Sequence, residues 1–511
     1  MKVFKTLVFS SILFGVLGPL LTPPNEKPAP APNRELRGAW MATVLNIDYP
    51  QRPTVDPAVL QADFRSQLHR LQTIGMNAVF VQVRAASDAI YPSQYAPWSQ
   101  WLTGRQGVAP GSEFDPLAFM IDEAHSRGME FHAWLNPYRV SMNLDSTGFA
   151  ADNVFYEHRD WVRKYGDRWY LDPGLPQVQS FLLTAVGELV DNYDIDGIHF
   201  DDYFYPYPLP GEFFPDSLTY QQYGRAYVSL EEWRRDNVNR MVRQVSRLIK
   251  SKKPYVKFGI SPFGVWRNQD RDPRGSATRA FATSYDDLYG DALAWATEGT
   301  IDYLAPQLYW NIGFDAADYA VLLDWWTTYT NIESKIYIGH AAYKVGDNPE
   351  PAWNDLEELP RQINLNRQNP RISGSLFFST KSLLNSSVEL DQRLRDVFSE
   401  LRMVPEHPGA TSPLPLAPKM GKVKKTAKGT RIVWELEDAV PDDELPYYYA
   451  IYRSLPNETA KLIHITPFNQ GCRRYHFYDK NTAAAEKPAI YEVRAVDRWH
   501  RESIPSNDIV P

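Results

Sequence analysis

Residues 196–203 read DGIHFDDY, a short run in which apolar and polar side chains alternate. Successive side chains of a β-strand point to opposite faces, so we expect Ile198 and Phe200 to share one face and to pack on helices. The other face then carries Gly197, His199, Asp201 and Tyr203. The stretch is therefore typical of a barrel strand that ends with an acidic side chain at the barrel mouth.

Seven more apolar runs of similar length are spread along the chain. They occupy residues 37–45, 77–84, 130–136, 256–263, 302–310, 335–341 and 374–380. Helical patterns lie between them, and two of these patterns, 56–75 and 115–128, begin with Asp-Pro and close with Gly. Strand–helix alternation repeated eight times predicts a (β/α)8 TIM barrel. A doubly wound sheet is the alternative, but it requires a Gly-rich turn after its first strand, and VLNIDYP at 44–50 is not one.

Two Pro-rich stretches divide the chain. Residues 22–34 and 404–418 are predicted linkers, because dense proline prevents regular structure. The barrel is expected between them, over residues 35–403. Residues 419–511 contain short alternating segments and no long helical pattern, which predicts a small all-β sandwich of the fibronectin type III kind.

Residues 1–21 read MKVFKTLVFSSILFGVLGPLL, in which Lys2 and Lys5 precede an apolar stretch. This pattern predicts a secretory signal peptide and a secreted or periplasmic location in the cell envelope. An uncleaved signal anchor is the alternative, since no good A-x-A cleavage site follows.

The amino-acid composition argues against some classes of function and favours others. A net charge of -8 argues against a nucleic-acid partner, because proteins that follow phosphates usually carry a basic surface. Aromatic residues make up 14% of the 511 residues, which is more than core packing usually needs. Grooves that bind sugars or peptides often contain many such rings. Cys472 is the single cysteine, which excludes a cysteine-rich zinc cluster.

Polar side chains gather where the predicted strands end. Because active sites of these barrels lie at the carboxyl ends of the strands, we expect these side chains to share one rim. They are Arg84, Asn136, His199, Asp201, Tyr203, Ser261, Gln307, Tyr309 and His340. Aromatic segments follow several strand ends, at 95–102, 200–208, 263–266 and 308–310. The alternative is that these polar groups are buried and satisfy one another.

The chemistry available at this rim is that of carboxylates. The chain has no G-x-S-x-G elbow, no P-loop and no H-E-x-x-H helix. A mixed metal site of His199, Asp201 and Asp202 remains an alternative. Glycoside hydrolysis instead needs two carboxyl groups beside the scissile bond and flat apolar surfaces for the sugar, and the rim offers both.

Asp201 is the first catalytic candidate, because it lies at a strand end on the inward face. Asp202, the next residue, is its nearest possible partner. When two carboxylates lie this close together, the pKa of one of them is raised and that carboxyl stays protonated. Asp88, and Asp286 or Asp287, are the other possible partners. Arg84 is expected to orient a carboxylate or to bind one on the substrate.

Eight motifs in order resemble those of the bacterial glycosyl-hydrolase-like family ten domain, over about residues 34–400. They are RGAWMATV, GMNAVFVQVR, FHAWLNPYR, LDPGLPQV, DGIHFDDYFYP, GISPFGVWRN, DYLAPQLYW and GSLFFSTKSL. The resemblance implies a (β/α)8 barrel with glycosidase activity, in some members on peptidoglycan strands stripped of their stem peptides. DGIHFD also resembles the D-G-x-R-x-D of α-amylase-type barrels, which implies a nucleophilic Asp201. His199 replaces the Arg of that pattern, and KFGISPFG lacks the acid Glu.

The sequence therefore predicts an exported glycoside hydrolase acting on a polysaccharide, with peptidoglycan glycan as the expected substrate and no cofactor or metal. Asp201 is the predicted nucleophile or base, and Asp202 or Asp88 the predicted acid. The predicted substrate-binding residues are Arg84, Asn136, His199, Tyr203, Gln307, Tyr309, Trp310 and His340. The alternatives are a carbohydrate-binding scaffold without activity and a metal-dependent hydrolase or deacetylase. For the tail, a spacer or wall-binding role is expected.

Overall fold

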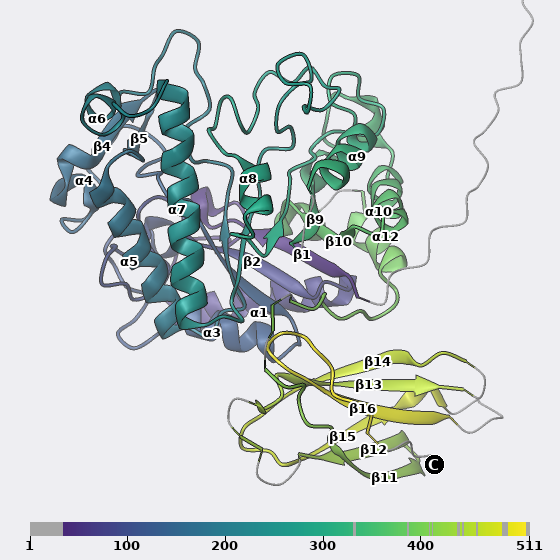
Figure 1. The fold of residues 1–511 in the computed structure, drawn as a ribbon. Helices are drawn as coiled ribbons and strands as arrows, with labels where there is room; N and C mark the ends of the chain where they lie inside the picture. The colour runs from purple at the N-terminus through teal and green to yellow at the C-terminus, as the bar shows by residue number, and fades with distance from the viewer. Residues whose placement is uncertain are drawn as a thin grey trace, which may run out of the picture.

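The structure is a computed structural model. It describes residues 34–506 except 331–333, 386–387, 408, 411, 437–439, 442–443, 456–457 and 483–488. The predicted signal peptide and all but the last residue of the first predicted linker lie outside the described residues. In Figure 1 a large α/β unit carries a smaller all-β unit at one end.

Eight parallel strands form a closed barrel in the order β1-β10-β9-β8-β7-β6-β3-β2. They are β1 Leu36–Met41, β2 Ala78–Arg84, β3 Glu130–Leu135, β6 Gly197–Phe200, β7 Lys257–Ile260, β8 Tyr303–Leu304, β9 Lys335–His340 and β10 Ile372–Phe377. Each falls within or beside one of the eight predicted runs, so the predicted barrel is confirmed. The alternative, a doubly wound open sheet, is excluded, because β1 and β10 pair and close the ring.

Helices cover the outside of the barrel (Figure 1). The longer ones are α1 Pro57–Ile74, α3 Pro116–His125, α5 Pro176–Asn192, α7 Leu230–Lys252, α9 Tyr319–Tyr329, α10 Glu358–Gln368 and α12 Leu390–Val397. Shorter ones are α2 Gln100–Thr103, α4 Val154–Glu157, α6 Ser217–Tyr223, α8 Ala292–Thr297 and α11 Thr380–Leu384, with 3-10 turns η1 Val44–Asn46, η2 Arg159–Trp161, η3 Ala342–Lys344 and η4 Pro351–Asn354. The Asp-Pro starts act as predicted: the Asp56 and Asp115 carboxylates accept first-turn amides of α1 and α3.

The two faces of the strands have different partners. Val79, Val81 and Val83 of β2 belong to the large apolar core beneath the helices. Inside the barrel, aromatic rings stack across the axis: the ring centroids of Phe80 and His132 lie 4.1 Å apart. The interior is therefore filled with side chains, and only the carboxyl ends of the strands are left to form a cavity.

One part of the large unit was not predicted. The long connection from β3 to α5 contains a two-stranded antiparallel hairpin, β4 Val162–Tyr165 and β5 Arg168–Leu171. Tyr170 of β5 pairs with Arg139, which follows β3, so the hairpin is fastened to the chain just beyond a strand end. The hairpin thereby reaches the rim of the barrel.

The C-terminal unit consists of two three-stranded antiparallel sheets. One sheet is β11 Lys419–Thr426, β12 Gly429–Glu435 and β15 Arg474–Asp479, and the other is β14 Lys461–Pro467, β13 Tyr448–Ser454 and β16 Ile490–Val496; the short η6 Lys480–Thr482 follows β15. Trp434, Tyr449 and Val493 belong to one apolar core between the sheets. This confirms the predicted small β-sandwich, while its fibronectin type III relationship stays a prediction.

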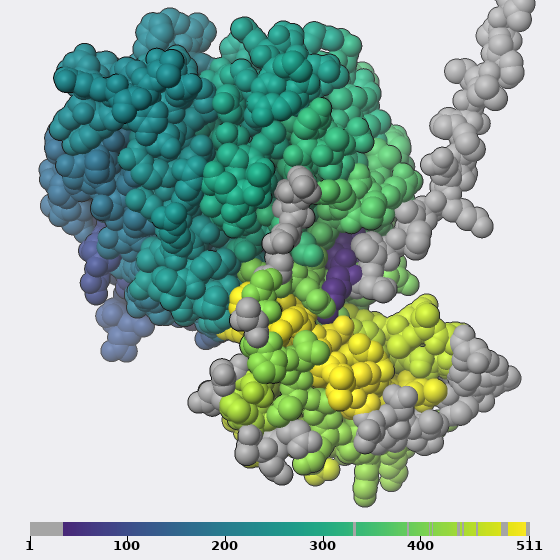
Figure 2. Space-filling model, in the orientation of Figure 1, coloured from purple at the N-terminus to yellow at the C-terminus, as the bar shows by residue number. Residues whose placement is uncertain are grey.

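The C-terminal sandwich packs against the large unit (Figure 2). Its contacts lie at the end of the barrel where the strands begin. The ring of His500 meets the carboxylate of Glu130, the first residue of β3, at 2.5 Å. Arg34, before β1, donates to the backbone carbonyl of His500 at 2.7 Å. The opposite end of the barrel is thus free of the C-terminal unit. Within the described part of the chain, no helix combines the length and apolar character that crossing a membrane requires.

Candidate active site

A cavity of about 540 Å³ opens at the carboxyl ends of the strands. Its walls are rich in aromatic rings: Trp40, Trp134, Tyr203, Tyr207, Phe263, Tyr309, Trp310, Tyr343 and Phe378. Three cationic side chains also line it, those of Arg139, Arg168 and Lys344. Among the described residues, the acidic side chains that line it are Asp201 and Asp202. Both directly follow β6.

Two amide side chains hold the Asp201 carboxylate in place. Asn136 Nδ2 donates to Asp201 Oδ2 at 3.0 Å, and Gln307 Nε2 donates to Oδ1 at 3.2 Å. The backbone amide of Asp202 donates to the same Oδ1 at 2.9 Å. Gln82 Nε2 in turn donates to Asn136 Oδ1 at 2.6 Å. This chain of amides fixes the orientation of Asp201, whose side chain stays at the cavity wall.

Asp202 has a different environment. Asp202 is almost fully buried, with 3% of its surface exposed. The Tyr207 hydroxyl donates a hydrogen bond to Asp202 Oδ2. Burial and the neighbouring charge of Asp201 raise the pKa of Asp202 well above that of an ordinary carboxyl. A carboxyl with such a raised pKa keeps its proton at higher pH, as a general acid requires. Burial also raises the pKa of Tyr207, which therefore remains a donor.

His199 lies beneath the site and does not line the cavity. Trp40 Nε1 donates to His199 Nε2 at 3.1 Å, so the proton of the ring is on Nδ1, which lies 3.0 Å from the Tyr303 hydroxyl. Ser261 Oγ also lies 3.0 Å from Nε2. With both nitrogens engaged, His199 supports the floor of the site. In the described part of the chain, no cluster of three His, Cys, Asp or Glu side chains suits a metal ion.

Asn136 contacts Asp201 from behind the cavity wall, and two further predicted substrate-binding residues, Arg84 and His340, lie away from the site. The register of β2 shifts between Gln82 and Arg84, so Arg84 pairs with Leu135 and leaves the inward face; its guanidinium lies 3.5 Å from the Tyr91 hydroxyl. His340 is fully buried beside the helix α10, where its Nδ1 lies 2.9 Å from Gln362 Oε1. Neither side chain lines the cavity. The bulge explains the position of Arg84. His340 instead shares the outward face of β9 with Ile336 and Ile338, which belong to the core beneath the helices.

The proposed alternative acids are also separated from Asp201. Asp88 lines a neighbouring cavity of about 140 Å³, and its Oδ1 accepts the backbone amide of Ala86 at 2.9 Å. Asp286 forms an ion pair with Arg267 at 2.9 Å, and Asp287 accepts the backbone amide of Thr283 at 2.7 Å. Asp88 therefore closes a turn after β2 and is not among the residues of the main cavity.

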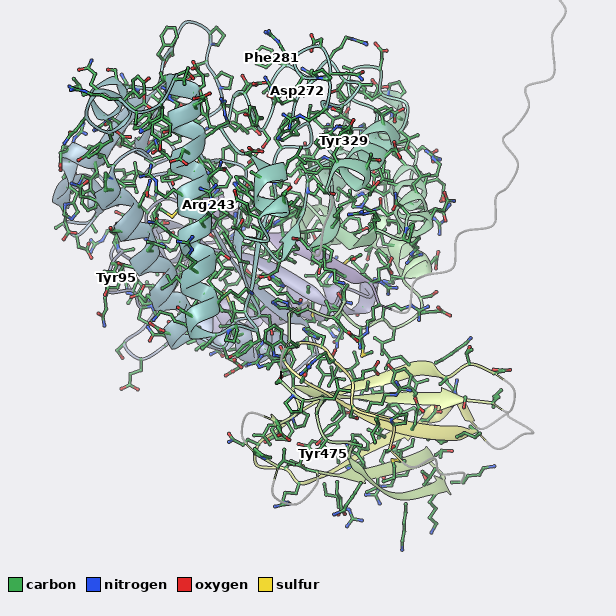
Figure 3. The ribbon with its side chains drawn as sticks, viewed as in Figure 1. Tyr95, Arg243, Asp272, Phe281, Tyr329 and Tyr475 are labelled. Carbon is green, nitrogen blue, oxygen red and sulfur yellow. The ribbon has the colours of Figure 1, made fainter. Side chains whose placement is uncertain are left out.

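Asp286 belongs to the long connection from β7 to α8, which rises above the barrel. Figure 3 labels Asp272 and the strongly exposed Phe281 on this connection. Arg267 Nη1 pairs with Asp272 at 3.0 Å, so the ion pairs of Asp272 and Asp286 fix the loop itself. Its carboxylates thus have a structural role.

Several lining residues were missed by sequence reasoning. Arg139 comes three positions after Asn136, and its Nε donates to the Ala85 carbonyl at 2.9 Å while its guanidinium lies 5.5 Å from the centre of the Tyr203 ring. Arg168 comes from the unpredicted hairpin. Lys344 lies in η3, and its Nζ donates to the Tyr309 carbonyl at 2.6 Å. Only the position of Arg139 inside the FHAWLNPYR motif offered a signal.

An eight-stranded barrel that presents an acid pair in an aromatic-lined cavity at its carboxyl ends is the arrangement of barrel glycoside hydrolases. The family model described as Glycosyl hydrolase-like 10 matches residues 35–355, and the chain belongs to this family. The predicted enzyme class, a glycoside hydrolase, is confirmed.

Two relatives with similar sequences, YngK and DigH, agree with this assignment. The chain is 45% identical to the glycosyl hydrolase YngK of Bacillus subtilis over 475 residues, which cover 92% of each protein. It is 44% identical to the glycosyl hydrolase DigH of Escherichia coli K12 over 385 residues, covering 70% of this chain and 87% of that one. The solved glycoside hydrolase domain of PgaB (BpsB) from Bordetella bronchiseptica is 15% identical, with a TM-score of 0.47, and covers 71% of this chain and 99% of that one.

Proposed function

We propose that the protein is an exported hydrolase that cleaves the glycan strands of peptidoglycan, with Asp202 as general acid and Asp201 as its charged partner. The raised pKa of Asp202 supports the acid role, because this carboxyl can protonate the leaving oxygen. Asp201, held as an acceptor by three donors, carries the negative charge of the pair. Export rests on the predicted signal peptide at residues 1–21.

The balance of charged side chains in the cavity is the main support for an anionic glycan as substrate. With Asp202 protonated, one carboxylate faces the side chains of Arg139, Arg168 and Lys344. Arg168 has an ion pair at 3.4 Å with Asp167, but that residue's side chain is 80% exposed. An excess of positive charge in a protein of net charge -8 favours an anionic substrate over a neutral glucan. Glycan strands without stem peptides have this property, because each muramic acid then carries a free lactyl carboxylate.

The aromatic walls suit a sugar chain. Trp310 lies edge-on to Phe263 with ring centroids 5.6 Å apart, and both line the cavity. Tyr309 and Tyr343 form a second pair, with centroids 6.0 Å apart. Rings that are partly exposed offer apolar faces for pyranose rings and keep their polar atoms for hydroxyl groups.

Hydrolysis of peptide-free glycan strands by the purified protein is the direct test. New reducing ends are expected with the native protein and not with Asp201→Asn, while both proteins keep the same unfolding midpoint. Strands that bind without being cleaved would instead indicate a carbohydrate-binding scaffold. Fractionation of cells that express the full chain tests export, which requires the protein in the envelope fraction.

A further inference from the structure

The two acids of the site come from neighbouring positions at the end of one strand. Both side chains line the cavity and their carboxyls hydrogen-bond to each other, so they belong to the same side of it. A glycosidase that uses an enzyme nucleophile needs its two carboxyls on opposite sides of the scissile bond, about 5 Å or more apart. Among the described residues that line the cavity, no further Asp or Glu is available for the opposite side.

The other nucleophilic groups of the cavity are poorly suited to attack. Burial raises the pKa of the Tyr203, Tyr309 and Tyr343 hydroxyls, which therefore remain protonated. Ser261 Oγ contacts His199 Nε2, but that nitrogen already accepts the indole N–H of Trp40. A serine nucleophile needs a free, oriented base, and this histidine is committed to the floor of the site.

We propose that the attacking group is supplied by the substrate: the carbonyl oxygen of the 2-acetamido group of the sugar bound beside Asp201 attacks C1 of the same sugar. This inference rests on the proposed function and defines the substrate further, as a glycan that carries an N-acetyl group on the sugar whose bond is cleaved.

The step balances with the groups present. As the acetamido oxygen bonds to C1, the C1–O bond to the leaving sugar breaks, and the proton of Asp202 goes to that oxygen. Asp201 accepts the acetamido N–H and balances the positive charge of the oxazolinium ring that forms. Water then attacks C1, gives a proton to Asp202, and the ring opens to restore the acetamido group. Two inversions at C1 retain its configuration.

The setting of Asp201 agrees with this role. A carboxylate offers about four lone-pair positions. Three of them are occupied by donors from Asn136, Gln307 and the amide of Asp202. The fourth meets the Asp202 carboxyl, and the substrate N–H is expected to take this position when Asp202 turns its proton to the leaving oxygen. A carboxylate held by three donors is an oriented acceptor, and its charge is spread over hydrogen bonds that weaken it as a nucleophile.

The test compares peptide-free glycan strands whose amino groups carry acetyl or trifluoroacetyl. The fluorinated carbonyl has nearly the same shape but is a much weaker nucleophile. We expect kcat to fall by about ten-fold or more with KM little changed. An equal kcat on both strands would overturn the inference. Strands de-N-acetylated and then re-acetylated are the control for chemical damage and are expected to regain the native rate.

Trapping provides a second, independent readout. Incubation with a chitobiose-derived thiazoline, a stable mimic of the oxazolinium ring, is expected to inhibit competitively at concentrations far below those of chitobiose itself. Isolation of a covalent glycosyl–Asp201 ester would contradict the inference. If acetylated strands are not cleaved at all, the proposed function fails; if they are cleaved without regard to the acyl group, only this inference fails.

Discussion

The two ends of the barrel both bury carboxylates, but they treat them in opposite ways. At the end where the strands begin, Glu130 is 1% exposed and contacts Lys257, His132 and His500. These neighbours hold the pKa of Glu130 well below its usual range despite burial. At the other end, Asp202 meets another carboxylate, and its pKa is raised.

A column of hydrogen bonds connects the two ends through the interior. His199 Nδ1 lies 3.0 Å from the Tyr303 hydroxyl, which lies 3.1 Å from His132 Nδ1, and His132 Nε2 lies 3.0 Å from Glu130 Oε2. Polar groups therefore fill the axis of the barrel without leaving it accessible.

The contrast between Glu130 and Asp202 shows how the surroundings give a buried carboxyl either a structural or a catalytic role. A buried carboxylate with cationic partners contributes to the structure, and the sandwich domain covers it with His500. A buried carboxyl beside a like charge is kept protonated and reactive, and it needs an open cavity. Five substitutions test this contrast, in order of the expected change in the quantity measured for each, which is activity for some and unfolding free energy for others.

Asp201→Asn removes the charge of the reactive pair and keeps its shape. We expect kcat/KM on glycan strands to fall by about 10³-fold, because the charged acceptor is lost. Thermal unfolding should stay within a few degrees of the native protein. Asp88→Asn, which changes an acid of the neighbouring cavity, is the matched control, and an equal loss there would remove the distinction between the two cavities.

Glu130→Gln should damage stability and leave chemistry alone. Lys257 would remain buried without its carboxylate, which costs about 3–5 kcal/mol of unfolding free energy. Because the folded pKa of Glu130 is lowered, its contribution exists above the unfolded pKa and is lost as the pH falls through the folded pKa. The destabilisation measured by denaturant should therefore shrink in acid. Glu435→Gln, in an exposed pair with Arg474 at 3.2 Å, should change stability by about 0.5 kcal/mol or less.

Arg168→Gln tests the cationic wall of the cavity. On strands with free lactyl carboxylates, we expect KM to rise by about ten-fold, the effect of one charge-assisted contact. On strands whose carboxyls have been reduced to alcohols, native and variant proteins should differ little. Arg279→Gln, in an exposed pair with Asp315, serves as the control for net charge. The same rise in KM on both kinds of strand would contradict a carboxylate-binding role.

Asp202→Asn should stabilise the fold while lowering activity. A carboxyl whose folded pKa is raised contributes stability that is complete below its unfolded pKa and is lost as the pH rises through the folded pKa. At neutral pH the neutral amide avoids this loss, so the unfolding free energy should increase by about 1 kcal/mol. The gain should vanish near pH 3, where the native carboxyl is protonated in both states; a gain that persists there would point to packing instead.

Tyr207→Phe is the finest probe. The Tyr207 hydroxyl donates to Asp202 and lowers its pKa, against the larger effect of burial. Removing it should move the basic limb of the pH profile of kcat/KM to higher pH by roughly one unit or less. A limb that moves to lower pH would show that another group provides the acid.

Much of the architecture follows from short-range regularities. The eight strands, the Asp56 and Asp115 helix caps and the inward face of β6 depend on alternation and on capping residues, which are written in consecutive letters. The same alternation predicted Asp201 at the mouth of the barrel, and Asp201 does line the cavity there.

Tertiary structure alone decided the rest of the site. The bulge in β2 turned Arg84 outward, and the β4–β5 hairpin brought Arg168 to the cavity from an insertion with no barrel pattern. Asn136 and Gln307 acquired their role because β3, next to β6, and β8, two strands away on its other side, end near the same carboxylate. Alternation specifies which face a side chain takes, but the partner it meets depends on the closure of the ring, which joins residues more than a hundred positions apart.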